Sequence, residues 1–140
     1  MPELPEIEII LQGLSPHLEG NTVTGLSVHT PLLRWPISTD LAETLPGQTV
    51  LKLERRGKYL LMHCTVGTVL FHLGMTGYLR LLSSDANRGK HDHLDIYFQS
   101  GVVLRLNDVR RFGTVVWVGA SPYAHPLLAE LGPEPLAMVV

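Results

Sequence analysis

The chain begins with a proline that could act as a nucleophile once the first methionine is removed. Pro2 follows Met1 directly, and Glu3 and Glu6 supply two nearby carboxylates. A free α-amino group titrates at about 7.7–8.0, whereas a lysine titrates at about 10.4, so much of a terminal proline is unprotonated at neutral pH. A secondary amine that attacks a sugar or carbonyl carbon gives an iminium directly, which makes Pro2 a candidate for covalent catalysis. While Met1 is attached, the same nitrogen is a tertiary amide and cannot attack; the alternative is that Pro2 only leads rigidly into a helix.

The middle of the chain carries most of its positive charge. Residues 52–111 hold ten of the eleven Lys and Arg residues but only five of the thirteen Asp and Glu residues, a net charge of +5, although the whole chain has −2. This distribution predicts a surface that faces a polyanion, with a set of solvated strand faces as the alternative. The run Arg55-Arg56-Gly57-Lys58-Tyr59 places three cations around a glycine, where the backbone can approach a phosphate closely.

Three further motifs carry groups suited to nucleic acid or metal. Met75 stands between two glycines in the run 72–77, which predicts an exposed loop tip that contacts a partner. The run 108–113 combines two arginines with Phe112, the chemistry of a wedge in a base stack. His91-Asp92-His93 has the spacing of metal ligands on one strand face, but no further ligands converge on it, so we do not predict a metal site. The polar run 83–90 is expected to be a mobile loop that either contacts phosphate or is only solvated.

Composition bounds the class of protein. With 140 residues, 45% of them hydrophobic and 17% charged, the chain is expected to form one globular domain, residues 1–140, with a buried core. Cys64 is the only cysteine, which excludes an internal disulfide and a cysteine-based zinc site within one chain. We find no secretory signal and no apolar run near the roughly 18 residues of a membrane span, so we expect a cytoplasmic protein without a membrane partner.

The hydrophobic pattern predicts a mainly β protein with flanking helices. Apolar residues at i, i+3, i+4 and i+7 from Ile7 to Leu14 predict an amphipathic helix of about ten residues, interrupted by Pro16 and Gly20. Strands are expected near 22–29, 48–56, 58–64, 67–73, 77–82, 93–99, 102–107 and 113–118, with hairpin turns at 65–67, 74–77 and 100–101. Short helices are expected at 40–45, capped by Ser38 or Thr39, and at 122–131. The predicted architecture is a two-layer antiparallel β-sandwich of about eight strands with a packed N-terminal α-helix.

Taken together and in order, these motifs closely resemble one protein family. The runs that carry the resemblance are Met-Pro-Glu-Leu-Pro-Glu at 1–6, Leu-Arg-Trp-Pro at 33–36, Arg-Gly-Lys-Tyr at 56–59, His-Leu-Gly-Met at 72–75, Lys-His-Asp-His at 90–93, Arg-Arg-Phe-Gly at 110–113 and Leu-Ala-Glu-Leu-Gly-Pro-Glu-Pro at 128–135. They resemble the N-terminal catalytic domain of the bacterial formamidopyrimidine-DNA glycosylases over essentially the whole chain. One departure is Val109, where the family usually has proline. The resemblance implies base-excision DNA repair by a bifunctional glycosylase and AP lyase that removes oxidised purines such as 8-oxoguanine and formamidopyrimidines.

The resemblance also assigns roles to residues of this chain. Pro2 would attack C1′ of the damaged nucleotide, displace the base and form a Schiff base that β- and δ-elimination cleave. Glu3 would protonate the deoxyribose ring oxygen, Glu6 would hold Pro2 and the nucleotide in place, and Lys58 would grip phosphate at the lesion. The base must leave the stack for this chemistry. The DNA-binding set would be Arg34, His72, Met75, His91, Arg110, Arg111 and Phe112, with Met75 and Arg110 filling the vacated space and Phe112 wedged beside the orphan base.

Members of this family continue into a helix-two-turn-helix segment and a four-cysteine zinc finger, for which the 140 residues have no counterpart. We therefore expect no zinc or other cofactor in this chain, weak DNA binding and little or no turnover. The expected partners are damaged double-stranded DNA and the C-terminal lobe of the same enzyme. Three alternatives remain: an endonuclease VIII-type glycosylase for oxidised pyrimidines, which usually opens Pro-Glu-Gly-Pro-Glu; a non-catalytic DNA-binding module; and an N-terminal-proline tautomerase, whose compact βαβ fold the predicted strands do not match.

Overall fold

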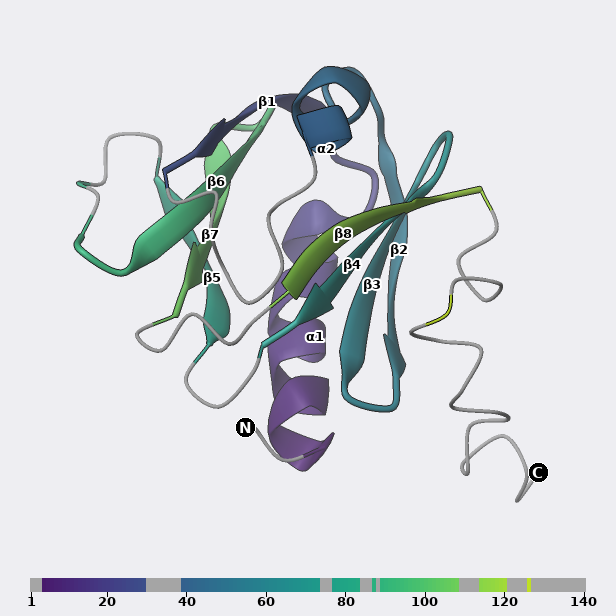
Figure 1. The fold of residues 1–140 in the computed structure, drawn as a ribbon, viewed down its shortest axis with the longest axis vertical. Helices are drawn as coiled ribbons and strands as arrows, with labels where there is room; N and C mark the ends of the chain where they lie inside the picture. The colour runs from purple at the N-terminus through teal and green to yellow at the C-terminus, as the bar shows by residue number, and fades with distance from the viewer. Residues whose placement is uncertain are drawn as a thin grey trace.

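Two four-stranded antiparallel sheets form the body of the molecule (Figure 1). The computed structural model describes residues 4–29, 39–73, 77–83, 87, 89–108, 114–120 and 126. Within these residues the elements are α1 (Leu4–Leu18), β1 (Val23–Val28), α2 (Thr39–Thr44), β2 (Val50–Arg56), β3 (Tyr59–Cys64), β4 (Thr68–His72), β5 (Tyr78–Ser83), β6 (Asp92–Phe98), β7 (Val102–Asn107) and β8 (Thr114–Gly119). The predicted sandwich is confirmed, and no described helix is long and apolar enough to cross a membrane.

The helices cover the open sides of the sandwich. One sheet has the strand order β1-β6-β7-β5 and the other the order β2-β3-β4-β8. Helix α1 packs against β2 and β5, which are edge strands of different sheets, and α2 contacts β1 and β8, the opposite two edges. In Figure 1, α1 accordingly lies between the two sheets. The first helix is therefore fixed by both layers, and so is the position at which the chain enters it.

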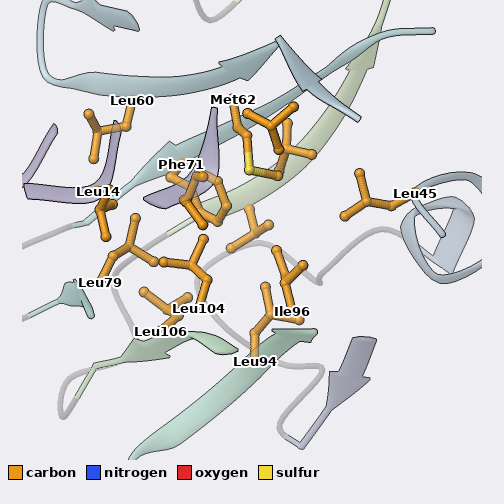
Figure 2. Packing of buried hydrophobic residues seen from close by; sticks show 14 of the residues in the cluster. Leu14, Leu45, Leu60, Met62, Phe71, Leu79, Leu94, Ile96, Leu104 and Leu106 are labelled. Carbon is orange, nitrogen blue, oxygen red and sulfur yellow. The ribbon is translucent and has the colours of Figure 1, made fainter. Parts of the chain in front are cut away.

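The core lies between the inner faces of the sheets and the apolar face of α1. Figure 2 shows side chains from both layers pointing toward one another, among them Met62 and Phe71 from one sheet and Ile96 and Leu104 from the other. Ile7, Leu14 and Leu18 complete this cluster from α1. Burial of each large side chain stabilises the fold by about 1.5–3 kcal/mol, so the periodic apolar positions decide which face of each element turns inward.

Helix α1 is longer than the sequence pattern predicts, because it continues through Pro16 to Leu18. Pro16 has no N–H, so the carbonyl of Gln12 loses its helical donor. Two hydrogen bonds maintain the last turn: Ser15 Oγ donates to the Leu11 carbonyl at 2.9 Å, and the Glu19 N–H donates to the Ser15 carbonyl at 3.0 Å. Leu18 is fully buried, and its burial offsets the cost of the proline.

Two of the three predicted hairpins are confirmed. The turns at 65–67 and 100–101 join paired strands, β3 with β4 and β6 with β7. The expected hairpin at 74–77 is wrong, because β4 pairs with β3 and β8 whereas β5 pairs with β7 in the other sheet. The Gly77 N–H donates to the Leu73 carbonyl at 2.9 Å, and a Cβ on Gly77 would lie 2.1 Å from that oxygen. The glycine signal thus marks a tight turn, but this turn changes sheet.

The predicted helix at 40–45 is confirmed as α2. Of its two proposed caps, Thr39 is the first residue of the helix and Ser38 lies outside the described residues. The expected helix at 122–131 also lies outside them, apart from residue 126.

Candidate nucleic-acid interface

Several elements begin, turn or end at one end of the β2-β3-β4-β8 sheet, where the strands of the sheet start or finish. Backbone pairing places Arg56 opposite Tyr59, Tyr59 opposite His72, and His72 opposite Thr114. The β2–β3 turn, the end of β4 and the start of β8 therefore lie in one row, on the lower side of Figure 1 near the start of α1. This row brings together Tyr59 of the motif at 56–59 and His72 of the motif at 72–75.

An ion pair ties the β2–β3 turn to the first turns of α1. Arg55 Nε donates to Glu8 Oε2 at 3.2 Å, and Arg55 Nη1 donates to the Gly57 carbonyl at 3.1 Å. Gly57 has a φ of 59°, a conformation in which a Cβ would be strained, so the turn requires glycine. Lys58 follows it and is exposed. Of the three cations grouped by the sequence, Arg55 is therefore directed inward as a support for the turn, while Lys58 is directed to solvent.

Glu6 and His72 are accessible to different degrees at this end of the sheet. Glu6 is exposed in the first turn of α1, where the helix dipole favours a negative group. His72 is half-buried, and its ring lies 5.1 Å from the Tyr59 ring at an interplanar angle of 49°. Contact with the Tyr59 ring limits the orientations of the imidazole, whose ring N–H can donate to a phosphate oxygen.

The two histidines of the His91-Asp92-His93 run have different environments. His91 is half-buried, and its carbonyl accepts the Asp108 N–H at 3.0 Å. His93 is fully buried, and its Nε2 donates to the Asp108 carbonyl at 2.6 Å. His93 therefore joins the start of β6 to the residue after β7, and only His91 is placed to contact a partner. Among the described residues, no group of three or more His, Cys, Asp or Glu side chains could hold a metal ion.

Seven of the predicted site residues lie outside the described residues: Pro2, Glu3, Arg34, Met75, Arg110, Arg111 and Phe112. Their described neighbours in the chain have defined positions. Asp108 bonds to His91 and His93, Thr114 pairs with His72, and Gly77 bonds to Leu73. The two sheets therefore lie next to each other at the strand ends that carry Lys58 and His72.

Sequence reasoning missed a buried charge cluster on the outer face of the other sheet. Arg105 donates to Asp95 through Nε at 2.7 Å and Nη2 at 2.9 Å, His29 Nε2 donates to Asp95 Oδ2 at 3.1 Å, and Arg105 Nη1 lies 3.5 Å from Asp92 Oδ2. Asp92, Asp95 and Arg105 are each only 3% exposed. The sequence places these charges in the polyanion-facing stretch 52–111, and that assignment is wrong for them. The alternation of residues along a strand predicts that these charged side chains lie on the face away from the core. It does not predict that they are buried there.

The partners of this cluster keep its carboxyl groups ionised. Burial is the largest single influence on Asp95 and raises its pKa, but the hydrogen bonds and charges of Arg105 and His29 together outweigh it, so the pKa lies below its ordinary value. For Asp92, burial is again opposed, by hydrogen bonds from Asn107 and the Gly89 N–H and by the charges of Arg105 and Arg80, with a lowered pKa as the result.

Comparison with known proteins identifies the family. Residues 1–115 match the model of the formamidopyrimidine-DNA glycosylase N-terminal domain. The chain belongs to this family. Formamidopyrimidine-DNA glycosylases of Nitrosococcus oceani and Geobacter metallireducens are each 54% identical to it over 136 residues, which is 97% of this chain and 50% and 51% of theirs. The chain thus spans about half the length of the curated relatives it matches.

Solved structures of the family agree with the fold. The formamidopyrimidine-DNA glycosylase of Lactococcus lactis, non-covalently bound to DNA containing an AP site, superposes with a TM-score of 0.82 at 31% identity, covering 92% of this chain and 49% of that one. The same enzyme with DNA containing N7-benzyl-Fapy-dG gives a TM-score of 0.83 at 32% identity, covering 92% and 48%. The sandwich described above is therefore the fold of this family's N-terminal half.

Proposed function

We propose that this chain is the catalytic half of a DNA glycosylase and AP lyase of base-excision repair, which removes oxidised purines from double-stranded DNA in the bacterial cytoplasm. The observation that carries the proposal is the family match over residues 1–115, which includes the Pro2-Glu3 opening directly before α1. Because α1 is packed against both sheets, the chain enters it at a fixed place, beside the turn that presents Lys58.

The proposed chemistry begins when removal of Met1 frees the nitrogen of Pro2. That nitrogen attacks C1′ of the damaged nucleotide, the bond from C1′ to the base breaks, and the base leaves with the electron pair and takes up a proton. Glu3 protonates the ring oxygen, the sugar opens, and a Schiff base forms between Pro2 and C1′. β-Elimination and then δ-elimination break the bonds to the 3′ and 5′ phosphates. A secondary amine supplies the electrophilic iminium by itself, so the reaction at Pro2 needs no metal or organic cofactor.

The other residues of the proposed site bind and orient the DNA. Lys58 offers an exposed ammonium to a phosphate at the lesion, and Glu6 lies exposed in the first turn of α1, close in sequence to Pro2. His72 and His91 contribute further phosphate contacts. Arg34 and Arg111 bind DNA, Met75 and Arg110 fill the space that the extruded base leaves, and Phe112 stacks beside the orphan base.

Borohydride trapping on an abasic-site duplex tests the proposal. The chain, in large excess over DNA, is expected to give a covalent protein–DNA adduct on a denaturing gel, with intact mass recorded on the same sample to establish that Met1 is absent. The variant Pro2→Gly, which replaces the secondary amine by a primary one, is expected to lose most of the adduct, while the matched control Pro5→Ala keeps it. An adduct of equal yield in Pro2→Gly would overturn the role of Pro2.

Two other functions predict different results with undamaged duplexes and with duplexes that carry an intact lesion. A non-catalytic DNA-binding module would bind damaged and undamaged duplexes alike and would be indifferent to Pro2→Gly. A glycosylase for oxidised pyrimidines would give Pro2-dependent excision of an oxidised pyrimidine and leave 8-oxoguanine in place. We favour purine lesions because Leu4 and the combination of Met75 with the Arg-Phe pair at 111–112 are typical of the purine branch.

A further inference from the structure

The connection between β5 and β6 joins opposite ends of its sheet. Both strands are antiparallel to β7, so they run in the same direction with β7 between them. β5 ends with Ser83 opposite Val102, and β6 begins with Asp92 opposite Asn107. The connection must therefore pass from one end of β7 to the other.

Two buried side chains hold the described backbone of this connection. Arg105 Nη1 donates to the Asn87 carbonyl at 2.8 Å, and the Gly89 N–H donates to Asp92 Oδ2 at 2.5 Å. Asn107 Nδ2 donates to the other carboxylate oxygen of Asp92 at 2.9 Å and so fixes the orientation of that carboxylate. The sequence predicts a mobile loop for residues 83–90; within it, the Asn87 carbonyl and the Gly89 N–H are each hydrogen-bonded to a buried side chain.

The residues that follow these anchors are Lys90 and His91 of the Lys-His-Asp-His run. Lys90 is exposed and His91 is half-buried, with its carbonyl bonded to the Asp108 N–H at 3.0 Å. The hydrogen bond between Gly89 and Asp92 therefore spans Lys90 and His91. The bond from the Asp108 N–H to the His91 carbonyl holds the second of these residues. An acidic side chain beside Lys90 and His91 would weaken their attraction for phosphate if it faced the same way. Asp92 is instead directed inward, where the charge of Arg105 compensates it.

We propose that Asp92 is a positioning residue, which together with Arg105 holds the backbone groups of Asn87 and of Gly89 so that Lys90 and His91 face DNA phosphates. The DNA part of this inference rests on the proposed function. A buried ion pair contributes little net stability compared with apolar packing of the same volume. It does fix the direction of the backbone groups to which it bonds, and at Asp92 and Arg105 those groups belong to the segment that leads into Lys90.

Limited trypsin digestion measures the anchoring without DNA. Trypsin cleaves after Lys90 only when the segment opens, and cleavage after the exposed Lys58 serves as the internal reference. We expect Asp92→Ala to raise the relative rate of cleavage at Lys90 by about tenfold, as loss of one or two hydrogen bonds implies. Asp92→Asn keeps one oxygen acceptor and should show a smaller increase. His29→Ala, which disturbs Asp95 in the same cluster but not the segment, should show none.

Binding of a short abasic-site duplex at several salt concentrations measures the consequence for DNA. Asp92→Ala should weaken binding and lower the slope of log K against log salt by about one, as expected for one lost phosphate contact. In a chain that already carries Lys90→Ala and His91→Ala, Asp92→Ala should have no further effect on affinity. Asn107→Ala provides a second variant that loosens Asp92 without removing it, should Asp92→Ala not fold.

The two measurements separate failure of this inference from failure of the proposed function. Equal cleavage at Lys90 in wild type, Asp92→Ala and Asn107→Ala would overturn the anchoring role. Faster cleavage with unchanged DNA affinity would overturn the positioning role. If the unchanged chain does not bind the duplex, the proposed function is contradicted, and the digestion still decides whether Asp92 holds the segment.

Discussion

Lys58 and Arg55 belong to the same cationic run but face opposite ways, which leads to opposite predictions for their alanine variants. Lys58 is exposed at the turn, so Lys58→Ala should leave the free energy of unfolding within about 0.5 kcal/mol of wild type. It should also lower the slope of log K against log salt for DNA by about one. Arg55 bonds to Glu8 and to the Gly57 carbonyl, so Arg55→Ala should lower the free energy of unfolding by about 1 kcal/mol or more. Urea unfolding and fluorescence anisotropy measure the two quantities; similar behaviour of both variants would contradict the assignment.

Cys64 is a buried thiol, and we expect it to be chemically inert in the folded protein. Burial raises its pKa to about 12, so almost no reactive thiolate exists at pH 7–8. Ellman's reagent should leave the native chain unlabelled over an hour and should label one thiol per chain in urea. Complete labelling within minutes in native buffer would contradict this burial.

At the residue scale, the sequence identified the kinds of groups at the site but not the direction of each side chain. The cationic run at 55–58 and the run at 90–93 are both recognisable from residue type. That Arg55 is directed toward Glu8 depends on how α1 packs on β2, and that His93 is buried depends on a bond to Asp108 across the sheet. Neither contact is local in sequence, so no spacing rule could predict it.

Pro16 lies inside α1, and its replacement tests what maintains the last turn of that helix. Pro16→Ala restores a donor for the Gln12 carbonyl and removes the ring that crowds it. Proline in a helix interior destabilises the folded state by about 3 kcal/mol relative to alanine. It also lowers the conformational entropy of the unfolded chain, which stabilises the folded state by up to about 1 kcal/mol. We therefore expect the free energy of unfolding to rise by about 2 kcal/mol in urea titration. A lower stability of Pro16→Ala would show that the turn is built around the proline.

At the element scale, alternation of apolar residues predicted all eight described strands to within about two residues, because each strand has one face in the core. The length of α1 was underestimated, since the burial of Leu18 outweighs a local helix-breaking residue. The turn near Gly77 was recognised, but its partner strand was not. Turn residues indicate where the chain reverses, whereas strand pairing is decided by packing of the whole sandwich.

For the whole molecule, the buried charge cluster predicts sensitivity to acid. The pKa of Asp95 is lowered in the folded chain, so its contribution to stability is complete above the ordinary carboxyl pKa of about 3.9 and is lost as pH falls through the folded value. Wild type should lose stability steeply below about pH 4. Asp95→Asn should be less stable at pH 7 but should show a shallower decline as the pH falls below about 4. Parallel pH profiles of the two proteins, measured by urea unfolding, would contradict this role.

The chain covers about half the length of its relatives. This leads to a prediction about which half of the longer proteins supplies most of the affinity for DNA. The proposed chemistry belongs to Pro2 and its neighbours. The resemblance implies that the helix-two-turn-helix and the zinc finger supply much of the DNA-binding affinity. A second binding element linked to the first raises affinity without altering the chemistry of either. A longer version with both elements should therefore trap an abasic-site duplex at far lower protein concentration than this chain. At saturating concentration, both should show trapping that is mostly lost in Pro2→Gly.

A zinc chelator separates the two contributions in the same comparison. It should weaken DNA binding of the longer version by dismantling the four-cysteine finger, because structural zinc sites supply folding free energy. It should leave trapping by this chain unchanged, since the reaction proposed for Pro2 uses only an amine and a carboxyl group. Equal turnover of this chain and the longer version at low protein concentration would contradict the division, because it would mean that the sandwich alone holds the duplex as firmly as the two lobes together.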